Sequence, residues 1–351
     1  MRKRKITTID RVQRFCNKLY LNLEKTVSWR FKRNKKSDFP EIERLNRLME
    51  VFYKNKFLRI EDTQNLEIFK TMSIDDVEIE LLTYTPNPDS KKWIIASHWF
   101  GGHKYWALYH ALVLTKAGYN ILAYDFRNHG NSGDAPATMG ATEHRDFLAV
   151  LGWLRSNHND IETFGIMGTS MGAYVTEYNN IVNGDILRSL DLKFCIADVP
   201  YGSMESLFWK VKHQYLKTMT RRSTEKRINK LINKINKAAN VDLRDCNLFR
   251  KLKYENYVPA APTLFLHGKY DRVTPISDSY ELCLLSEAVL KGNEIYAFQN
   301  SPHTQSTRVH FADQTRLILE FVNKHDPKGF DVEGILQQYE ITEKLSDNYG
   351  V

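Results

Sequence analysis

From residue 91 onward the sequence alternates short apolar runs with segments in which apolar residues recur every three or four positions. The apolar runs are KKWIIASH (91–98), YNILAYD (119–125), ETFGIMG (162–168), LKFCIADVP (192–200), APTLFLHG (261–268) and NEIYAFQNS (293–301). Runs of this length are typical of strands buried on both faces, and the segments between them of helices. Strands that alternate with helices form a mainly parallel sheet covered on both sides. The sequence therefore predicts an α/β fold.

The chain ahead of this pattern has a different organisation. Residues 5–31 carry one apolar stripe with Lys and Arg on the other faces, which predicts a helix, and a second helix is predicted over residues 41–55. Residues 66–88 alternate like a pair of antiparallel strands that prolines bring to an end. We therefore divide the chain into a basic helical N-terminal extension (1–60), a main domain (61–325) and a polar, loosely attached C-terminal tail (326–351).

One connection is much longer than the others. About sixty residues separate Pro200 from Ala260, whereas each other connection after residue 91 carries roughly one helix. The insertion includes TEKRINKLINKINKAAN, which is the pattern of a basic amphipathic helix. We interpret residues 201–258 as a helical cap over one edge of the sheet.

Basic residues are concentrated in two segments. Residues 1–60 contain 18 Lys and Arg against 6 Asp and Glu, and residues 205–255 contain 14 against 5. Such segments suit anionic lipid, nucleic acid or an anionic substrate, or they are solvated helix faces. No P-loop, zinc-finger or helix-turn-helix signature occurs, so nucleic acid is not an expected partner. Peripheral contact of residues 1–36 and the cap with an anionic membrane is a hypothesis.

The sequence also favours a cytoplasmic protein, or one held peripherally at the inner face of the membrane. It contains no apolar run of about 18 residues, as a membrane-spanning helix requires, and its start lacks the apolar stretch of a secretory signal. The four cysteines are far apart and form no CxxC pair, which argues against a disulfide framework or a zinc site. They are Cys16, Cys195, Cys246 and Cys283.

The stretch GTSMG (168–172) has the pattern G-x-S-x-G, with Ser170 at its centre. A predicted strand leads into it and a predicted helix follows, which is the context of a nucleophile elbow. Glycines at Gly168 and Gly172 let strand and helix pack closely around the serine. A glycine-rich turn with an inert serine has the same local sequence, so the interpretation depends on partners elsewhere in the chain.

A serine becomes a nucleophile when a histidine takes its proton and an acid orients that histidine. Asp271 follows one predicted strand and His303 the next, where sites form at the carboxyl edge of a parallel sheet. Asp198 also follows a strand and is an alternative acid. His310 is an alternative base, but it falls within a predicted helix. We therefore predict the triad Ser170, Asp271 and His303.

An acyl-transfer site also needs two backbone N–H groups that stabilise an oxyanion. We predict that they belong to Met171 and to Phe100 in the loop HWFGGH, with Trp99 as second choice for the latter. The same loop could be interpreted as a metal site on His98 and His103. It lacks a convincing third ligand, so no metal is expected.

The segments SHWFGG, YDFRNHGNSG, GTSMGA, HGKYDRVTP and SPHT occur in an order and spacing that resemble the α/β-hydrolase superfamily. The likeness covers about residues 65–325 and is greatest to bacterial esterase, lipase and lysophospholipase-type members, close to the serine aminopeptidase and monoglyceride-lipase-like group. It implies an eight-stranded, mostly parallel sheet. It also implies Ser170 as nucleophile, His303 as base, Asp271 as orienting acid, and no metal or organic cofactor. YDFRNHGNSG is interpreted as a structural turn beside the site.

The expected activity is hydrolysis of a carboxylic ester through an acyl-serine intermediate. The basic segments favour a lipid-derived ester such as a lysophospholipid or monoacylglycerol. Aromatic residues are the candidates for an apolar acyl pocket, although core packing is their commoner fate. They are Trp99, Phe100, Tyr105, Trp106, Phe208 and Trp209. The alternatives are an acyl-CoA or other thioesterase, then a peptidase, and a catalytically silent binding protein of the same fold.

Overall fold

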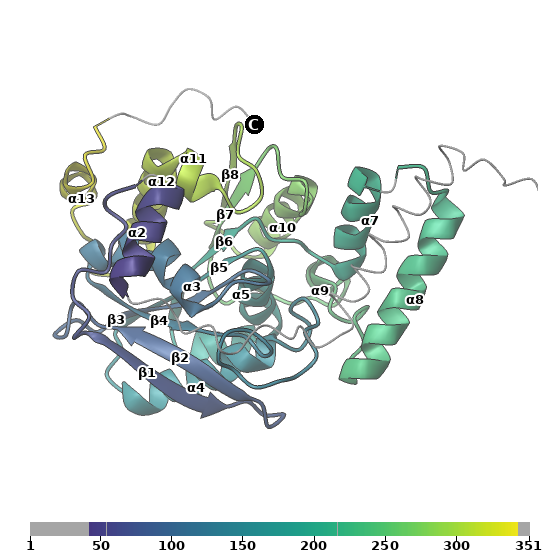
Figure 1. The fold of residues 1–351 in the computed structure, drawn as a ribbon, viewed down its shortest axis with the longest axis horizontal. Helices are drawn as coiled ribbons and strands as arrows, with labels where there is room; N and C mark the ends of the chain where they lie inside the picture. The colour runs from purple at the N-terminus through teal and green to yellow at the C-terminus, as the bar shows by residue number, and fades with distance from the viewer. Residues whose placement is uncertain (1–41, 54, 216, 343–351) are drawn as a thin grey trace, which may run out of the picture.

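The computed structural model of the protein describes residues 42–342, apart from residues 54 and 216. Its described residues contain one sheet of eight strands (Figure 1). The strands are β1 (Leu66–Met72), β2 (Glu78–Tyr84), β3 (Lys92–Ser97), β4 (Tyr119–Tyr124), β5 (Thr163–Thr169), β6 (Leu192–Asp198), β7 (Thr263–Gly268) and β8 (Glu294–Phe298). Their order is β1-β2-β4-β3-β5-β6-β7-β8. The pairs β1–β2 and β2–β4 are antiparallel and all others are parallel, as predicted.

Helices cover both faces of the sheet, which completes the predicted α/β-hydrolase architecture. Ahead of the cap they are α2 (Ile42–Tyr53), α3 (Lys104–Ala111), the 3-10 helix η1 (Leu112–Ala117), α4 (His144–Asn157), α5 (Met171–Val182) and α6 (Gly184–Ser189). After it they are α10 (Ile276–Val289), α11 (Ser306–Val309), α12 (Phe311–His325) and α13 (Val332–Gln338). Buried side chains of α4, α5 and α10 share one core cluster, and those of α3 and α12 share another.

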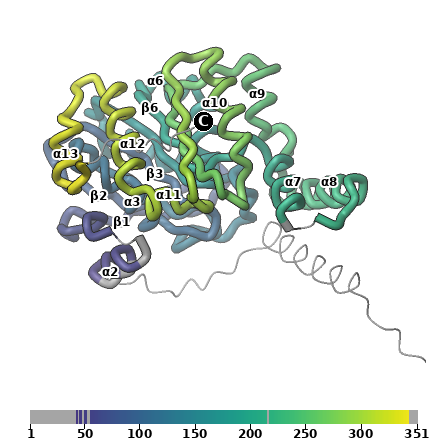
Figure 2. Tube along the Cα trace, turned by 90° about the horizontal axis from the view of Figure 1, so that it is seen from above, coloured from purple at the N-terminus to yellow at the C-terminus, as the bar shows by residue number. Residues whose placement is uncertain are grey.

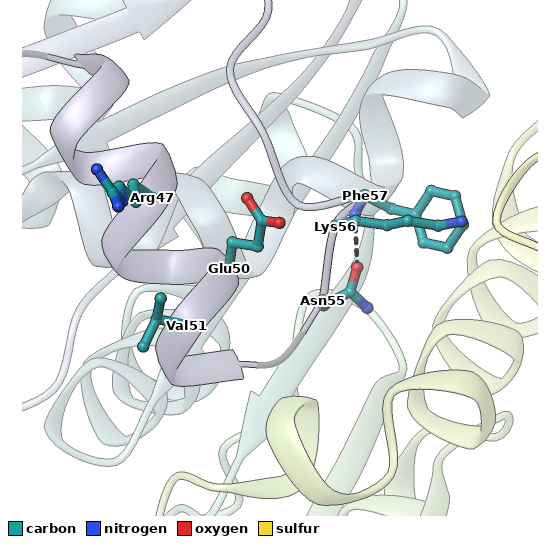
Figure 3. A pocket seen from close by; sticks show the side chains of 6 residues that line it. All are labelled: Arg47, Glu50, Val51, Asn55, Lys56 and Phe57. Carbon is teal, nitrogen blue, oxygen red and sulfur yellow. Dashed lines mark hydrogen bonds between the residues drawn. The ribbon is translucent and has the colours of Figure 1, made fainter.

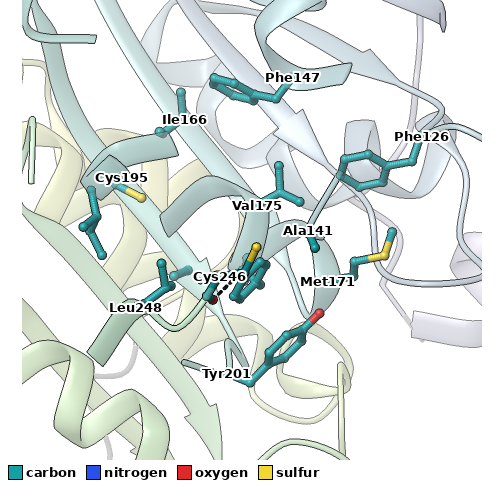
Figure 4. Close-up of a cluster of buried hydrophobic side chains, with 14 of the residues drawn as sticks. Phe126, Ala141, Phe147, Ile166, Met171, Val175, Cys195, Tyr201, Cys246 and Leu248 are labelled. Carbon is teal, nitrogen blue, oxygen red and sulfur yellow. Dashed lines mark hydrogen bonds between the residues drawn. The ribbon is translucent and has the colours of Figure 1, made fainter. Parts of the chain in front are cut away.

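The two core clusters follow from the alternation of side chains along each strand. In β3, Ile95 belongs to the cluster under α4 and α5, whereas Ile94 belongs to the cluster under α3 and α12. Figure 4 shows the first cluster, in which Met171 lies with Tyr201 and Leu248 from the two ends of the cap. The residue that follows Ser170 is thus anchored in the core.

The connection between β6 and β7 carries the three helices α7 (Met204–Tyr215), α8 (Arg221–Ala239) and α9 (Leu248–Tyr254), as the long insertion predicted. The apolar stripe of α8 is buried through Ile228, Leu231 and Ile235, which join the first core cluster. Figures 1 and 2 show α7 and α8 standing at one side of the sheet and its helices. The opposite face of α8 is exposed and basic.

Of the two predicted terminal segments, the C-terminal one needs correction. The helix predicted over residues 5–31 lies outside the described residues, but α2 forms as predicted and buries Leu45 and Met49 in the second core cluster. At the other end, residues 326–342 are not a loose tail, because Leu336 of α13 is fully buried and Tyr339, directly after the helix, is almost fully buried. The segment is mostly polar in composition, so the few apolar residues that pack in the second core cluster could not be recognised from the sequence.

The residues that follow α2 contact the residues that follow α13. The rings of Phe57 and Tyr339 lie edge to face with centroids 5.8 Å apart, and Lys56 forms an exposed ion pair with Glu340. A surface hollow adjoins this point, between α2 and the loop that follows it (Figure 3). It is lined by Arg47, Glu50, Val51, Asn55, Lys56 and Phe57. None of the predicted site residues lines it.

Among the described helices, none has the length and apolar character needed to cross a membrane. The three described cysteines, Cys195, Cys246 and Cys283, are buried free thiols, and Cys16 lies outside the described residues.

Candidate active site

Ser170 lies at a sharp turn between β5 and α5. Its φ of 55° and ψ of −112° are strained for a non-glycine residue, and only 4% of its surface is exposed. Two backbone hydrogen bonds hold the turn: the Ser170 N–H donates to the Asp198 carbonyl at 2.8 Å, and Tyr174 N–H donates to the Ser170 carbonyl at 2.9 Å. Ser170 is also the N-cap of α5, so it lies at the positive end of that helix.

The glycines beside Ser170 are required by close backbone approaches. A Cβ on Gly168 would lie 2.2 Å from the Gly172 carbonyl oxygen. A Cβ on Gly172 would lie 2.3 Å from the carbonyl oxygen of Ser97. The first turn of α5 is therefore pressed against the end of β3, where the loop of Phe100 begins.

The structure brings the three predicted triad residues into one hydrogen-bonded line. His303 Nε2 lies 2.9 Å from Ser170 Oγ, and His303 Nδ1 lies 2.6 Å from Asp271 Oδ2. Asp271 follows β7 and His303 follows β8, so the parallel sheet aligns their loops at its carboxyl edge. The His303 side chain is 20% exposed and the Asp271 side chain is fully buried. The arrangement can accept the serine proton on His303 and hold the resulting imidazolium.

Asp271 is held as a carboxylate by several donors. Its Oδ1 accepts from the N–H groups of Val273 and Thr274 at 2.7 and 2.9 Å, and its Oδ2 accepts from Thr274 Oγ1 at 2.8 Å. Burial alone would raise the pKa of Asp271, but the hydrogen bond and charge of His303 lower it, and the net pKa is about 2. Sequence reasoning did not identify Thr274, whose hydroxyl and N–H both fix this carboxylate.

Gly268 joins the loops that carry the acid and the histidine. A Cβ at this position would lie 2.1 Å from the carbonyl oxygen of Ser301, two residues before His303. The neighbouring His267 is fully buried, and its Nδ1 lies 2.7 Å from Ser279 Oγ. Burial lowers the pKa of His267 to about 4, so this second histidine is uncharged at neutral pH.

The alternative acid and base take other positions. His310 lies between α11 and α12 and donates from Nε2 to the Gln299 carbonyl, so it points away from the nucleophile. Asp198 ends β6 beside the elbow, but its carboxyl group forms no hydrogen bond with any described residue. Asp271, not Asp198, contacts His303.

Two histidines shape the loop that follows β3. His98 Nε2 accepts from the Phe126 N–H at 3.1 Å and its Nδ1 donates to the Trp99 carbonyl at 2.7 Å. His129 Nε2 accepts from the Gly101 N–H at 3.0 Å. Both ring nitrogens of His98 are thus committed to the backbone, which does not suit a metal ligand. The described residues contain no group of three or more His, Cys, Asp or Glu placed to hold a metal ion.

The turn YDFRNHGNSG has the structural role that the sequence indicated. Asp125 accepts from the backbone N–H and the Nζ of Lys104, each at 2.7 Å, and both side chains are buried. Arg127 donates to Asp146 and Asp75, and a Cβ on Gly130 would collide with Asp125. The turn holds His129 where it reaches the loop of Phe100.

The predicted oxyanion donors lie on adjacent elements. Met171 begins α5, whose first turn packs against the strand end that leads into the Phe100 loop. Met171 belongs to the first core cluster and Phe100 packs against it. The Trp99 carbonyl accepts from the Gly102 N–H at 2.8 Å, which closes the loop into a turn. The role of the two N–H groups stays a prediction.

The aromatic residues predicted to line one acyl pocket divide between the two faces of the sheet. Tyr105 belongs to the second core cluster and Trp106 packs against it, with the Trp99 ring 5.2 Å from the Trp106 ring. Phe208 and Trp209 of α7 belong to or pack against the first cluster. The latter pair shares its core cluster with Met171 and Phe100, and the role of all six residues in a pocket stays a prediction.

A cap anchor beside the site was missed in the sequence. Asp278, in the first turn of α10, accepts from the Gly202 N–H at 2.9 Å and from Ser206 Oγ at the start of α7. Burial raises the pKa of Asp278 to about 6. This contact joins the base of the cap to the helix that follows the Asp271 loop. The pattern DRVTPISDS gave no signal of it, because the partner lies more than seventy residues away.

The sheet topology, the strained serine at a strand-to-helix turn and the hydrogen-bonded histidine and acid define an α/β-hydrolase of the serine hydrolase class. A model of the prolyl oligopeptidase family matches residues 106–327, which is more than half of the chain. The protein belongs to this family. The closer likeness to the monoglyceride-lipase-like group stays a prediction.

A curated relative is the uncharacterized protein YqkD of Bacillus subtilis (strain 168). It is 25% identical over 213 residues, which cover 59% of this chain and 63% of the relative. The match thus spans less than two thirds of the relative's own length.

Solved structures share the fold at low identity. An esterase of Pyrococcus furiosus superposes with a TM-score of 0.56 at 20% identity, covering 74% of this chain and 92% of the esterase. The acylaminoacyl peptidase of Pyrococcus horikoshii gives 0.55 at 19% identity, covering 77% of this chain and 44% of the peptidase. Est1E of Butyrivibrio proteoclasticus, solved with ferulic acid bound, gives 0.54 at 17% identity over 73% and 98% of the two chains. At these identities the likeness is one of fold.

Proposed function

We propose that the protein hydrolyses carboxylic esters through an acyl-serine intermediate, with Ser170, His303 and Asp271 as its catalytic triad. The observation that carries the proposal is the line of hydrogen bonds from Ser170 Oγ through His303 to Asp271. A fold of this class could hold an inert serine, but an inert serine needs neither a strained elbow nor a histidine within 2.9 Å.

In the proposed mechanism, Ser170 Oγ attacks the ester carbonyl carbon while His303 Nε2 takes the serine proton. Asp271 keeps the proton of the imidazole on Nδ1 and stabilises the imidazolium. The N–H groups of Met171 and Phe100 bind the oxyanion. His303 then gives its proton to the leaving alcohol. In the second half of the reaction His303 takes a proton from water while the water oxygen attacks the acyl carbon. The acyl–serine bond then breaks, His303 returns the proton to Ser170 Oγ, and the acid is released.

A fluorophosphonate probe tests the nucleophile. We expect the wild type to be labelled and Ser170→Ala to be unlabelled, while the control Ser286→Ala, a buried serine of α10, is labelled like the wild type. Labelling that does not depend on Ser170 would exclude the proposed mechanism, and absence of labelling in the wild type would favour a silent binding protein.

Peptide hydrolysis is the second candidate, favoured by the match to the prolyl oligopeptidase family and by the likeness to an acylaminoacyl peptidase. A pair of substrates with one acyl group, a p-nitrophenyl ester and a p-nitroanilide, separates the two. We expect the ester to be turned over and the anilide not. Anilide hydrolysis at comparable kcat/KM would replace the esterase proposal by a peptidase.

We infer further that the ester is lipid-derived and that the cap faces an anionic surface. The exposed side of α8 carries Arg222, Lys226 and Lys230 at intervals of four residues, so they form one row along the helix. Like charges in such a row repel one another, which an anionic partner would relieve. The same row would suit the phosphates of an acyl-CoA, which makes thioester hydrolysis the alternative.

Flotation with vesicles of anionic and of neutral phospholipid tests the surface. We expect Lys226→Glu/Lys230→Glu to lose binding to anionic vesicles, while Lys116→Glu/Lys291→Glu, which changes two exposed lysines of the body, keeps it. Equal binding of the two variants would remove the membrane proposal. Release of thiol from acyl-CoA, measured beside release of fatty acid from a lysophospholipid, separates the two substrate classes.

A further inference from the structure

Asp198 is a buried acid that the proposed mechanism does not use. It ends β6, its side chain is fully buried, and neither of its carboxyl oxygens has a hydrogen-bond partner among the described residues. Buried polar groups in folded proteins almost always have partners, so an exception beside a reactive serine needs a reason.

The sheet places Asp198 between the nucleophile and the acid. β6 lies between β5, which Ser170 follows, and β7, which precedes Asp271. The Cα of Asp198 pairs with those of Thr169 and Leu266 on the two neighbouring strands. Neighbouring strands are about 4.8 Å apart. Because the His303 ring joins Ser170 to Asp271, it crosses the end of the strand that Asp198 terminates.

The two acids are in opposite protonation states. Burial and then the charge of Asp271 raise the pKa of Asp198 to about 8, so Asp198 is uncharged at neutral pH. Asp271 stays ionised because His303, Val273 and Thr274 donate to it. Of the two acids, Asp271 is therefore the one that is charged at neutral pH.

Two buried histidines lie on elements near this edge of the sheet, and Lys210 of the cap acts electrostatically on one of them, His267. His267 of β7 and His110 of α3 are both buried, and burial lowers the pKa of each to about 4. His110 Nδ1 lies 3.2 Å from Thr169 Oγ1, on the strand next to Asp198. Neither histidine supplies a positive charge at neutral pH. In the proposed mechanism the positive charge forms on His303, which bonds to Asp271 at the same edge of the sheet.

We propose that Asp198, the buried acid without a partner at the end of β6, is a second, positioning acid that orients His303 when the carboxylate of Asp271 is removed. In that event Asp198 gives its proton to solvent, and its carboxylate accepts the hydrogen bond from His303 Nδ1. The inference rests on the proposed function, because it assigns a role around the same histidine.

The pH dependence of kcat/KM tests the proposal in four variants: Asp271→Asn, Asp198→Asn, the double variant, and Asp271→Asn/Glu177→Gln as control. Glu177 is another fully buried acid with a raised pKa, about 7, but it bonds to Cys195 and Thr263 in the core. In Asp271→Asn we expect activity to recover at least tenfold as the pH rises. The double variant should lack this recovery, and the control should keep it. Identical profiles for Asp271→Asn and the double variant would overturn the proposal.

Infrared spectroscopy measures the protonation state of Asp198 in the absence of a substrate. The infrared difference spectrum of wild type minus Asp198→Asn should contain the carbonyl band of a protonated, buried carboxylic acid at pH 7. In the Asp271→Asn background this band should disappear at a lower pH than in the wild type. A wild type without the band at pH 7 has an ionised Asp198, which contradicts the inference. Loss of Ser170-dependent labelling in the wild type would instead contradict the proposed function.

Discussion

Gly172→Ala should disable the site without unfolding the protein, because the added methyl group meets the backbone of the oxyanion loop. The new Cβ would lie 2.3 Å from the Ser97 carbonyl oxygen and 2.7 Å from that of His98, whereas ordinary contacts begin at 3.4 Å. Either the first turn of α5 or the loop after β3 must therefore move by about 1 Å, and a shift of that size costs about 100-fold in rate.

The expected loss lies in kcat, because the displaced N–H groups act on the oxyanion and not on the ground-state ester. A hundredfold decrease corresponds to about 2.7 kcal/mol of transition-state stabilisation. We would measure kcat and KM with the p-nitrophenyl ester that the wild type turns over best, and stability by urea unfolding, where overpacking should cost about 1–3 kcal/mol.

Gly152→Ala is the matched control. Gly152 lies on the exposed side of α4, and a Cβ there has nothing within 4 Å. The change should stabilise the protein by about 1 kcal/mol through helix propensity and leave kcat unaltered. A folded Gly172→Ala variant whose kcat stays within about threefold of the wild type would refute the reasoning, since the contact would then not position the donors.

Two further predictions concern stability. Leu336→Ala should lower the free energy of unfolding in urea by about 2–5 kcal/mol, because Leu336 is fully buried in the second core cluster. A decrease below about 0.5 kcal/mol would instead support the prediction of a loosely attached tail. Thr274→Val should cost about 1.5–3 kcal/mol at pH 7, since it removes the hydroxyl donor to the Asp271 carboxylate, whereas Thr274→Ser should keep the bond. The pKa of Asp271 is lowered on folding to about 2, so its contribution is present above about pH 4 and is lost as the pH falls towards 2. The difference between the Val and Ser variants should therefore shrink in unfolding experiments at acid pH.

The sheet could be predicted because each of its buried strands is one continuous apolar run bounded by turns. The line from Ser170 to Asp271 could be predicted for a related reason. Each reactive residue directly follows a strand, and a parallel sheet collects those positions at one edge whatever the distance along the chain. The choice of Asp271 over Asp198 was correct as to which acid contacts His303, but the sequence could not show that the carboxyl group of Asp198 is buried without a hydrogen-bond partner among the described residues.

Other parts of the site were beyond sequence reasoning because their partners are backbone groups. His98 bonds to the Trp99 carbonyl and the Phe126 N–H, and His129 bonds to the Gly101 N–H. Contacts with backbone groups do not depend on the type of the partner residue, so the sequence does not indicate them. α13 is only seven residues long, too short for a clear apolar period. The sequence could not show that the predicted aromatic residues divide between two core clusters, because residue order does not reveal which face of the sheet a side chain will cover; their role in a pocket stays a prediction.

The geometry separates the question of the acyl group from that of the leaving group. Under the proposed mechanism the leaving group must lie next to His303, which protonates it, and this is the triad member whose side chain reaches solvent. The acyl carbon bonds to Ser170, so the acyl chain extends past Met171 and Phe100 towards the cluster that holds Phe208 of α7. Variants of Phe208 should then change the preferred chain length and leave the ratio of ester to anilide hydrolysis unaltered.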